Sequence, residues 1–347
     1  MTPWLPRTCV WELTLGCDAA CVHCGSMAGT ARKDELDTRE ALGLVRDLGR
    51  LGCASVTLSG GEPLLRRDWP ELAEAIRDAG MGLELITNGL RVAAQAQTSA
   101  DRGFSAVTFS VDGPAAVHDA LRGVPGGLER LLRGAEGLRE RGVRLGAATQ
   151  VNRVNLPWLG AILDLLVTHG FQGWQLQLTM PAGRAREGTL CLEPQELPGL
   201  EARVVALQTE APFFVQAADN IGYLSRREPR LRTGRGGRER CWMGCGAGLT
   251  VVGLTSDGTV RGCLSLPPMA DEGNVRERSL ADIWHDPQAF AYNRQFRIED
   301  LGGTCRACTF GQICRGGCQS LSLSATGAFH NNPYCSGRFC YAGEVAG

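Results

Sequence analysis

The stretch VWELTLGCDAACVHC (residues 10–24) joins a β-rich run to three closely spaced cysteines. Cys17, Cys21 and Cys24 follow the run directly, with the spacing Cys-x3-Cys-x2-Cys. Three thiolates on one short loop can each bind one iron of a 4Fe–4S cubane. They leave the fourth iron open to an outside ligand, because such clusters usually take four cysteines. A zinc ion that borrows a fourth ligand, such as His23, is the alternative, although the x3 gap fits zinc loops poorly.

Composition narrows the classes of function. The chain has 347 residues, 44% of them hydrophobic, which is enough for one large core or a large core with a smaller one. Its 36 basic and 37 acidic residues leave a net charge of −1, which predicts neither a nucleic-acid partner nor an anionic membrane. No apolar run of about 18 residues indicates a membrane span. The start MTPWLPRTCV lacks the features of a signal peptide, so we expect a cytoplasmic protein.

The 15 cysteines are informative in that compartment. A reducing cytosol disfavours disulfides, and clustered thiols in a cytosolic chain more often bind metals or metal clusters. The cysteines fall into two main groups, at 17–24 and 241–340. Two ligand sets on two structural units are the simplest interpretation.

Strands and helices alternate regularly over about the first 210 residues. Six β-rich runs are predicted at 10–16, 55–60, 83–89, 106–113, 144–152 and 174–180. Helical patterns lie between them at 39–51, 68–79, 128–141 and 156–169. This alternation predicts βαβ units and a parallel sheet, either a partial barrel or an open doubly wound sheet.

In both architectures ligands gather at the carboxyl ends of the strands, and the polar and cysteine-rich loops lie there. The loops after the first four strands are the cysteine triplet, Gly60-Gly61-Glu62-Pro63, Thr87-Asn88-Gly89 and Ser110-Val111-Asp112-Gly113. Four such loops on one rim predict a single site.

The cysteine triplet after one strand and the Gly-Gly-Glu-Pro turn after the next resemble the radical S-adenosylmethionine (SAM) superfamily, over residues 1–210. The resemblance implies a partial (β/α)6 barrel whose triplet binds a 4Fe–4S cluster, with the open iron chelated by SAM. It implies that Gly60, Gly61, Glu62 and Pro63 bind the SAM amino group, with glycines that let the backbone come close. It further implies that Ser110, Asp112 and Asn152 touch the SAM ribose or carboxylate. A solvated Glu62 and an ordinary turn at Asp112 are the alternatives.

The same resemblance implies radical chemistry. A reduced cluster cleaves SAM to a 5′-deoxyadenosyl radical, which abstracts a hydrogen atom from the substrate. An external electron donor such as ferredoxin or flavodoxin is then expected. No catalytic acid or base can be assigned from the sequence.

The C-terminal cysteines resemble the SPASM extension of this superfamily, over residues 241–347. The pattern is Cys245-x12-Gly258-x4-Cys263, then Cys305-x2-Cys308-x5-Cys314-x3-Cys318, then Cys335. The resemblance implies two auxiliary 4Fe–4S clusters, hence three in all. One set is Cys241, Cys245, Cys263 and Cys318, and the other is Cys305, Cys308, Cys314 and Cys335. Cys241 lies outside the core pattern, Cys340 competes with Cys335, and two four-cysteine zinc sites are the alternative.

Within this small cysteine-rich domain, a β-hairpin is predicted to turn at 256–258, and a helix is predicted over 279–296. An arginine- and glycine-rich region at 211–240 connects it to the barrel. This region is interpreted either as a basic strip for an acidic substrate or as a solvated linker.

Substrate identity is the least determined property. The resemblance implies oxidative modification of a ribosomally made peptide, by crosslinking or dehydrogenation. A dehydrogenase or decarboxylase of a small molecule (a sugar, amino acid or tetrapyrrole) is the alternative, and an iron–sulfur electron carrier is a third. Leu264 stands after Cys263, where formylglycine-forming relatives have aspartate, which counts against that activity. Because about nine residues precede the first strand, leader recognition in the peptide reaction is expected to come from a separate leader-binding protein, from the SPASM surface or from the arginine strip.

Overall fold

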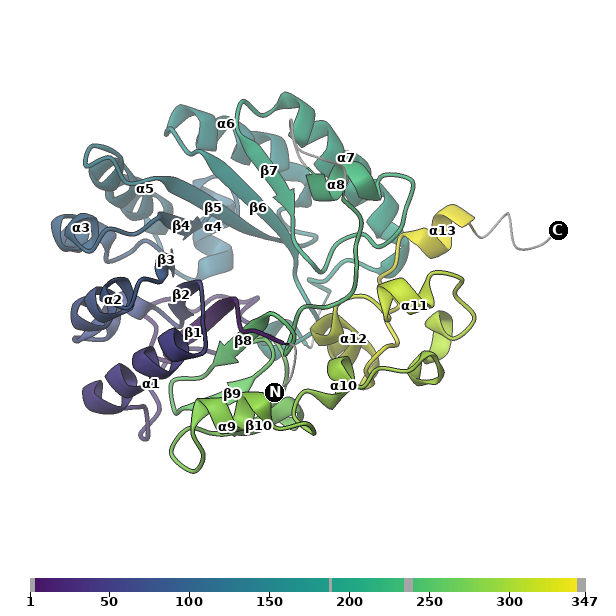
Figure 1. The fold of residues 1–347 in the computed structure, drawn as a ribbon. Helices are drawn as coiled ribbons and strands as arrows, with labels where there is room; N and C mark the ends of the chain where they lie inside the picture. The colour runs from purple at the N-terminus through teal and green to yellow at the C-terminus, as the bar shows by residue number, and fades with distance from the viewer. Residues whose placement is uncertain (1–3, 187–188, 234–239, 342–347) are drawn as a thin grey trace.

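A curved sheet of ten strands organises the chain (Figure 1). The computed structural model describes residues 4–186, 189–233 and 240–341. The sheet has the strand order β10-β9-β8-β1-β2-β3-β4-β5-β6-β7. The strands are β1 (Thr8–Thr14), β2 (Ser55–Gly60), β3 (Gly82–Thr87), β4 (Ala106–Ser110), β5 (Leu145–Val151), β6 (Gly173–Leu178), β7 (Phe214–Ala217), β8 (Val251–Leu254), β9 (Thr259–Arg261) and β10 (Asp271–Asn274).

Strands β1 to β7 are all parallel and follow one another in sequence order. A doubly wound sheet would reverse its strand order at a switch point. The order here does not reverse, and the strands curve around a common centre in Figure 1, so the fold is the predicted partial barrel. All six predicted strands are confirmed within a few residues, and β7 was not predicted.

The helices that precede the cysteine-rich region lie mostly on the outside of the barrel (Figure 1). They are α1 (Thr38–Arg50), α2 (Trp69–Asp78), α3 (Val92–Asp101), α4 (Ala115–Arg122), α5 (Gly127–Arg139), α6 (Leu159–Thr168), α7 (Leu197–Glu210) and α8 (Glu228–Thr233). Helix α1 shows why they form there. The Asp37 side chain accepts a hydrogen bond from the backbone N–H of Glu40 at 2.8 Å and caps the helix, while Leu44, Val45 and Leu48 are buried against the sheet.

The predicted hairpin of the C-terminal region joins the barrel sheet directly. Strands β8 and β9 are antiparallel around the predicted turn, and β8 pairs in parallel with β1. The turn is tied to β1, because Ser256 donates from its N–H and its hydroxyl to the buried Glu12 carboxylate, at 3.2 and 3.1 Å. The cysteine-rich region is therefore packed against the barrel, and the apolar core is continuous across both.

The helix predicted over 279–296 is wrong as a single element. The structure has two short helices there, α9 (Leu280–His285) and α10 (Ala291–Arg294). Pro287 lacks an N–H and disfavours a helical conformation at the preceding residue, and Phe290 has φ 57°, so the helix cannot continue. Three further helices follow: α11 (Gly311–Cys314), α12 (Gln319–Thr326) and α13 (Gly337–Tyr341).

The region predicted as a connection at 211–240 contains both β7 and α8, although residues 234–239 lie outside the described ranges. Arg232 of the arginine strip is committed to the fold, because its guanidinium pairs with Glu228 at 2.8 Å and donates to the carbonyl oxygen of Ala218 at 2.9 Å. The domain boundary at 210 stays a prediction. No helix in the described part of the chain combines the length and apolar character that crossing a membrane requires.

Candidate active site and cluster sites

The three cysteines after β1 lie together on one loop. Burial is the main cause that raises the pKa of Cys17 to about 11, and the neighbouring Cys21 thiol contributes to the rise. The pKa of Cys21 is likewise raised by burial, with Cys24 beside it. Each thiol also has a donor pointed at its sulfur. The donors are the Ala19 N–H to Cys17 at 3.5 Å, Arg122 Nη1 to Cys21 at 3.6 Å and the Ala28 N–H to Cys24 at 3.4 Å.

Such donors stabilise thiolates, which are the form of cysteine that binds iron, so the loop fits the cluster that the sequence predicts. Asn88 of the loop after β3 adds a weaker donor, with its Nδ2 at 3.8 Å from Cys17 Sγ and 2.9 Å from an Asp18 carboxylate oxygen. The sequence placed Asn88 on the rim without a role. The structure brings it to the cysteine loop.

Two other rim segments hold the loop in place. The last residue of α4, Arg122, accepts a hydrogen bond at its carbonyl oxygen from the Ala20 N–H of the loop, at 3.1 Å. The segment after β6 clamps the other side, where the Arg184 N–H donates to the Cys24 carbonyl at 3.0 Å. Gly183 is required there, because it has φ 55° and an added Cβ would lie 2.3 Å from the Cys24 carbonyl oxygen.

The Gly-Gly-Glu-Pro turn packs against the end of β1. The Gly61 N–H donates to the Thr14 carbonyl and the Glu62 N–H to the Gly16 carbonyl, both at 2.8 Å. A Cβ added at Gly61 would lie 2.2 Å from the Gly16 carbonyl oxygen, and one at Gly60 would lie 2.4 Å from the Thr14 carbonyl oxygen. In this structure the glycines therefore permit close contact between two strand ends, next to the cysteine loop.

Glu62 is fully buried beside that loop. Its carboxylate accepts hydrogen bonds from the Thr87 hydroxyl at 2.9 Å and the Asn88 N–H at 2.8 Å. Burial raises the pKa of Glu62 to about 7, although these hydrogen bonds oppose the rise, and Glu62 is among the groups that raise the pKa of Cys17. The site thus holds a fixed carboxylate that changes charge near neutral pH. The solvated-loop alternative for Glu62 is excluded by its burial.

Asp112 is also fully buried, in a charged cluster behind the loop. One carboxylate oxygen accepts from Arg122 Nε at 2.7 Å and lies 3.2 Å from His23 Nε2, and the other accepts from the Gln150 N–H at 3.0 Å. Burial would raise the pKa of Asp112, but Arg122 and His23 outweigh it and hold the pKa well below its usual range. Since Arg122 also donates to Cys21, this cluster connects β4 to the cysteine loop.

The remaining predicted rim residues have local partners. Asn152 is buried, and its side-chain oxygen accepts from the Val154 N–H at 3.0 Å, while its amide donates to the Gln150 carbonyl at 3.0 Å. Ser110 is half-buried at the end of β4. Whether Ser110, Asp112 or Asn152 touches SAM stays a prediction.

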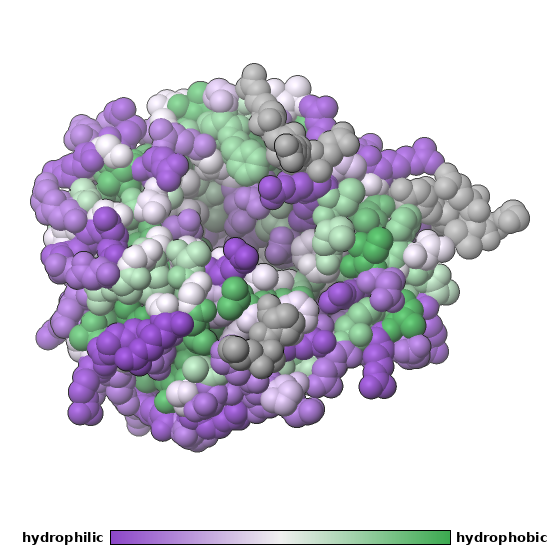
Figure 2. Space-filling model, in the orientation of Figure 1, coloured by the Kyte–Doolittle hydropathy of each residue, from purple (hydrophilic) through white to green (hydrophobic). Residues whose placement is uncertain are grey.

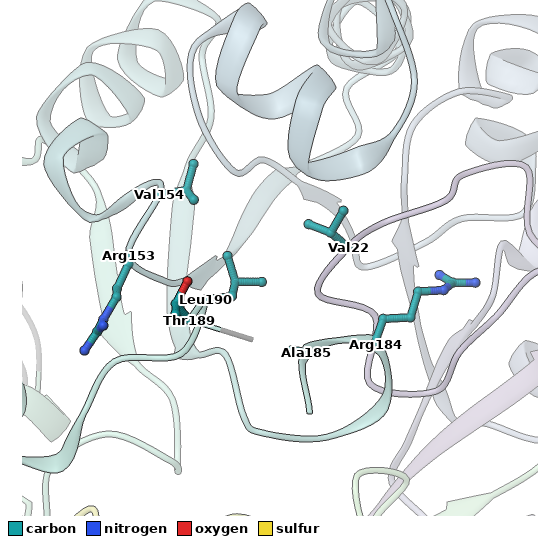
Figure 3. Close-up of a pocket in the computed structure, with 7 residues that line it drawn as sticks. All are labelled: Val22, Arg153, Val154, Arg184, Ala185, Thr189 and Leu190. Carbon is teal, nitrogen blue, oxygen red and sulfur yellow. The ribbon is translucent and has the colours of Figure 1, made fainter. Parts of the chain in front are cut away.

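A cavity of about 440 Å³ lies beside the loop (Figure 3). Figure 3 shows the guanidinium groups of Arg153 and Arg184 turned away from the centre of the cavity, so that mainly small and aliphatic side chains face it. Its volume is within the range of small-molecule sites. The lining residues are Val22, Arg153, Val154, Arg184, Ala185, Thr189 and Leu190.

The C-terminal thiols form two groups of electrostatic neighbours. Cys245 and Cys263 both raise the pKa of Cys318, which burial brings to about 12. Cys305 and Cys308 both raise the pKa of Cys335, which burial brings to about 11, and the same neighbours act on Cys314. These are the two predicted sets without Cys241, which is exposed.

The ligand roles of these thiols stay predictions, and the side chain of Cys340 lies outside the described residues. In the described ranges, no three His, Cys, Asp or Glu side chains are grouped around one position for a single metal ion. Figure 2 shows that the molecular face drawn there is hollowed between the barrel and the cysteine-rich region.

Comparisons with known proteins agree with this arrangement. The radical SAM superfamily model matches residues 11–160, and the SPASM iron–sulfur cluster-binding domain matches residues 245–309. An AdoMet-dependent heme synthase of Methanosarcina barkeri is 31% identical over 343 residues, which cover 95% of this chain and 96% of the relative. A PqqA peptide cyclase of Rhizobium meliloti is 29% identical over 95% of this chain and 87% of the relative.

Among solved structures, Streptococcus suis SuiB bound to S-adenosylmethionine has a TM-score of 0.73 at 19% identity, and the match covers 95% of this chain and 76% of that chain. The fold and the thiol-bearing rim define an iron–sulfur enzyme that uses SAM. The protein belongs to the radical SAM superfamily and carries a C-terminal SPASM domain.

Proposed function

We propose that this protein cleaves SAM at the Cys17, Cys21 and Cys24 loop and oxidises a tetrapyrrole, with two auxiliary clusters held by the C-terminal thiols. The observation that carries the SAM-cleaving role is the juxtaposition of three donor-supported thiols with the buried Glu62 carboxylate. When bound there, a 4Fe–4S cluster with one open iron supplies the electron that converts SAM to methionine and the 5′-deoxyadenosyl radical. An external donor such as ferredoxin or flavodoxin replaces that electron.

The residues of this chain position the reaction. Glu62, fixed by Thr87 and Asn88, is the acceptor that we assign to the SAM amino group. Gly60, Gly61 and Pro63 shape the turn around it. Because the Asp112 carboxylate is already bound by Arg122 and the Gln150 N–H, we assign it to holding Arg122 against Cys21 rather than to direct contact with SAM.

The tetrapyrrole assignment rests on the heme synthase of M. barkeri, which matches this chain across nearly the full length of both proteins. The reaction is a net two-electron oxidation of a side chain, by decarboxylation or dehydrogenation. The substrate would lose one hydrogen atom to the deoxyadenosyl radical and then one further electron. Clusters held by the two C-terminal thiol groups would supply an acceptor for that electron. Thiol-ligated clusters also favour a reducing compartment, which supports a cytoplasmic location.

The test is an anaerobic assay of the reconstituted protein with SAM and a one-electron reductant. We expect 5′-deoxyadenosine in every reaction, and with iron-bound and metal-free porphyrins that carry propionate side chains we expect loss of carbon dioxide or of two hydrogens by mass spectrometry. If no 5′-deoxyadenosine formed with any substrate, the proposed radical SAM activity would be contradicted. Its presence with no change in any porphyrin would contradict the substrate class alone.

A ribosomally made peptide is the second candidate, and the 29% identity to the PqqA peptide cyclase favours it. A peptide encoded beside the gene, with or without a separate leader-binding protein, is the substrate to include in the same assay. Loss of two hydrogens from that peptide, with no change in porphyrins, would select crosslinking or dehydrogenation of a peptide.

A further inference from the structure

Tyr292 of α10 lies next to the first group of C-terminal thiols. Its ring stacks on Phe329, with centroids 4.5 Å apart and planes within 1° of each other. Both rings pack against the same small apolar cluster that Cys245 and Cys263 contact. The His330 ring nitrogen Nε2 lies 2.7 Å from the Tyr292 carbonyl oxygen and fixes the backbone of this turn. The ring therefore has a defined position beside two of the three thiols.

The Tyr292 hydroxyl points at the chain segment that carries Cys263. A Cβ added to Gly262 would lie only 2.1 Å from this hydroxyl oxygen, so glycine at this position makes room for it. Cys245 and Cys263 are both electrostatic neighbours of Tyr292. A phenol hydroxyl is a hydrogen-bond donor, and this one is held against the segment that carries Cys263.

This hydroxyl is buried and has no hydrogen-bond partner among the described residues. Buried hydroxyl groups without a partner are costly and rare. Glu272 is also an electrostatic neighbour of Tyr292, and its carboxylate accepts a hydrogen bond from the Phe290 backbone. In the cysteine loop of the barrel, the side chains of Asn88 and Arg122 already donate to sulfur atoms, whereas the Tyr292 hydroxyl donates to no described group.

We propose, resting on the cluster sites of the proposed function, that the Tyr292 hydroxyl donates a hydrogen bond to a sulfur of the first auxiliary cluster and raises its reduction potential. Reduction adds negative charge to a cluster, and a donor to its sulfurs stabilises that charge, so hydrogen bonding makes the cluster easier to reduce. The first auxiliary cluster would then accept the substrate electron more readily than it could without Tyr292.

The test is the Tyr292→Phe variant, made in the full-length protein that also carries Cys17→Ala, Cys21→Ala and Cys24→Ala. Two auxiliary signals then remain, and each is titrated by potentiometry with electron paramagnetic resonance. We expect the midpoint potential of one auxiliary cluster to become more negative and that of the other auxiliary cluster to stay unchanged. At a fixed potential, the ratio of reduced to oxidised protein should fall severalfold for the first cluster. The matched control is Phe329→Leu, which disturbs the ring packing but keeps the hydroxyl.

An unchanged potential in Tyr292→Phe with full iron content would overturn the inference and leave the proposed function intact. A shift of equal size in Phe329→Leu would also overturn it, because packing would then be the cause. Absence of auxiliary iron in the parent protein would overturn the cluster sites and the inference together. If Tyr292→Phe fails to load iron, electron–nuclear double resonance on the parent decides: an exchangeable proton coupled to an auxiliary cluster is expected, and its absence counts against the inference.

Discussion

The barrel loop collects three thiols from eight consecutive residues, whereas the first C-terminal group collects Cys245, Cys263 and Cys318 from segments far apart in the chain. In the barrel, the sequence itself brings Cys17, Cys21 and Cys24 together, and the rim supplies the donors and clamps around them. In the C-terminal region, Cys263 follows the hairpin and Cys318 is the N-cap of α12, so only folding makes them neighbours. A local ligand set can be identified from its spacing, but a dispersed set depends on tertiary packing.

The largest expected effect separates the two regions completely. Replacing Cys17, Cys21 and Cys24 with Ala should abolish 5′-deoxyadenosine formation, because this cysteine loop lies beside the Glu62 turn. The C-terminal groups do not depend on the loop for their thiols, so iron should fall from about 12 to about 8 atoms per chain, at four per cluster. Chromatography of the nucleoside and iron analysis measure both quantities. Residual SAM cleavage would refute this assignment, and near-stoichiometric zinc would identify the C-terminal sites as zinc sites.

Gly61→Ala tests how strongly the rim supports the barrel loop. The new Cβ would lie 2.2 Å from the Gly16 carbonyl oxygen, and backbone on both sides cannot easily move. We expect a loss of about 2–3 kcal/mol in the free energy of unfolding, together with loss of SAM binding. Gly25→Ala is the matched control, because a Cβ there meets nothing within 4 Å although it follows Cys24 directly. Equal stability of the two variants would show that the strand ends are not tightly packed.

Glu62→Gln tests the buried carboxylate at the same rim. The pKa of Glu62 is raised to about 7, so the folded protein keeps a proton that the unfolded chain releases near its usual value of 4.5. The raised pKa contributes stability at low pH, and this contribution is lost as pH rises through about 7. Denaturant unfolding of the metal-free protein between pH 5 and pH 8 should show this loss in the wild type and not in Glu62→Gln. If the free energy of unfolding changed with pH in the same way in the wild type and in Glu62→Gln, Glu62 would have to be more solvated than the structure shows.

The smallest expected effect sharpens the C-terminal side of the comparison. Cys241 is exposed, whereas Cys245 has Cys263 and Cys318 as neighbours. We expect Cys245→Ala to lose about four iron atoms and Cys241→Ala to lose few. Iron analysis with Mössbauer spectroscopy distinguishes the two variants. An equal loss of iron in Cys241→Ala and Cys245→Ala would show that Cys241 is a ligand, as the SPASM resemblance implies.

The sequence by itself predicted the alternation of strands and helices, and it predicted the rim on which the candidate site lies. Strands have a period of two and helices a period of 3.6, so the alternation of elements could be read locally, and parallel βαβ units place their polar loops on one rim. The Cys17–Cys24 spacing and the Gly60–Pro63 turn could be recognised in the same way, since each is contained in a few consecutive residues. Two predictions of local structure failed. Strand β7 has only four residues and was not predicted, and the predicted C-terminal helix is divided at Pro287, a helix breaker that the sequence itself contains.

Only the tertiary structure decided which groups become partners. The burial of Glu62 beside Thr87 and Asn88, the approach of His23 to Asp112 and the contact of Gly61 with the end of β1 all join segments that are distant in sequence. The same is true of Tyr292, whose hydroxyl is placed beside Gly262 by the packing of α10. The periodicity of the sequence specifies which face of a helix or strand is buried. Which groups that face contacts depends on how the helices between the strands and the C-terminal hairpin pack. Charge and desolvation, which set the pKa values of these groups, follow from that packing.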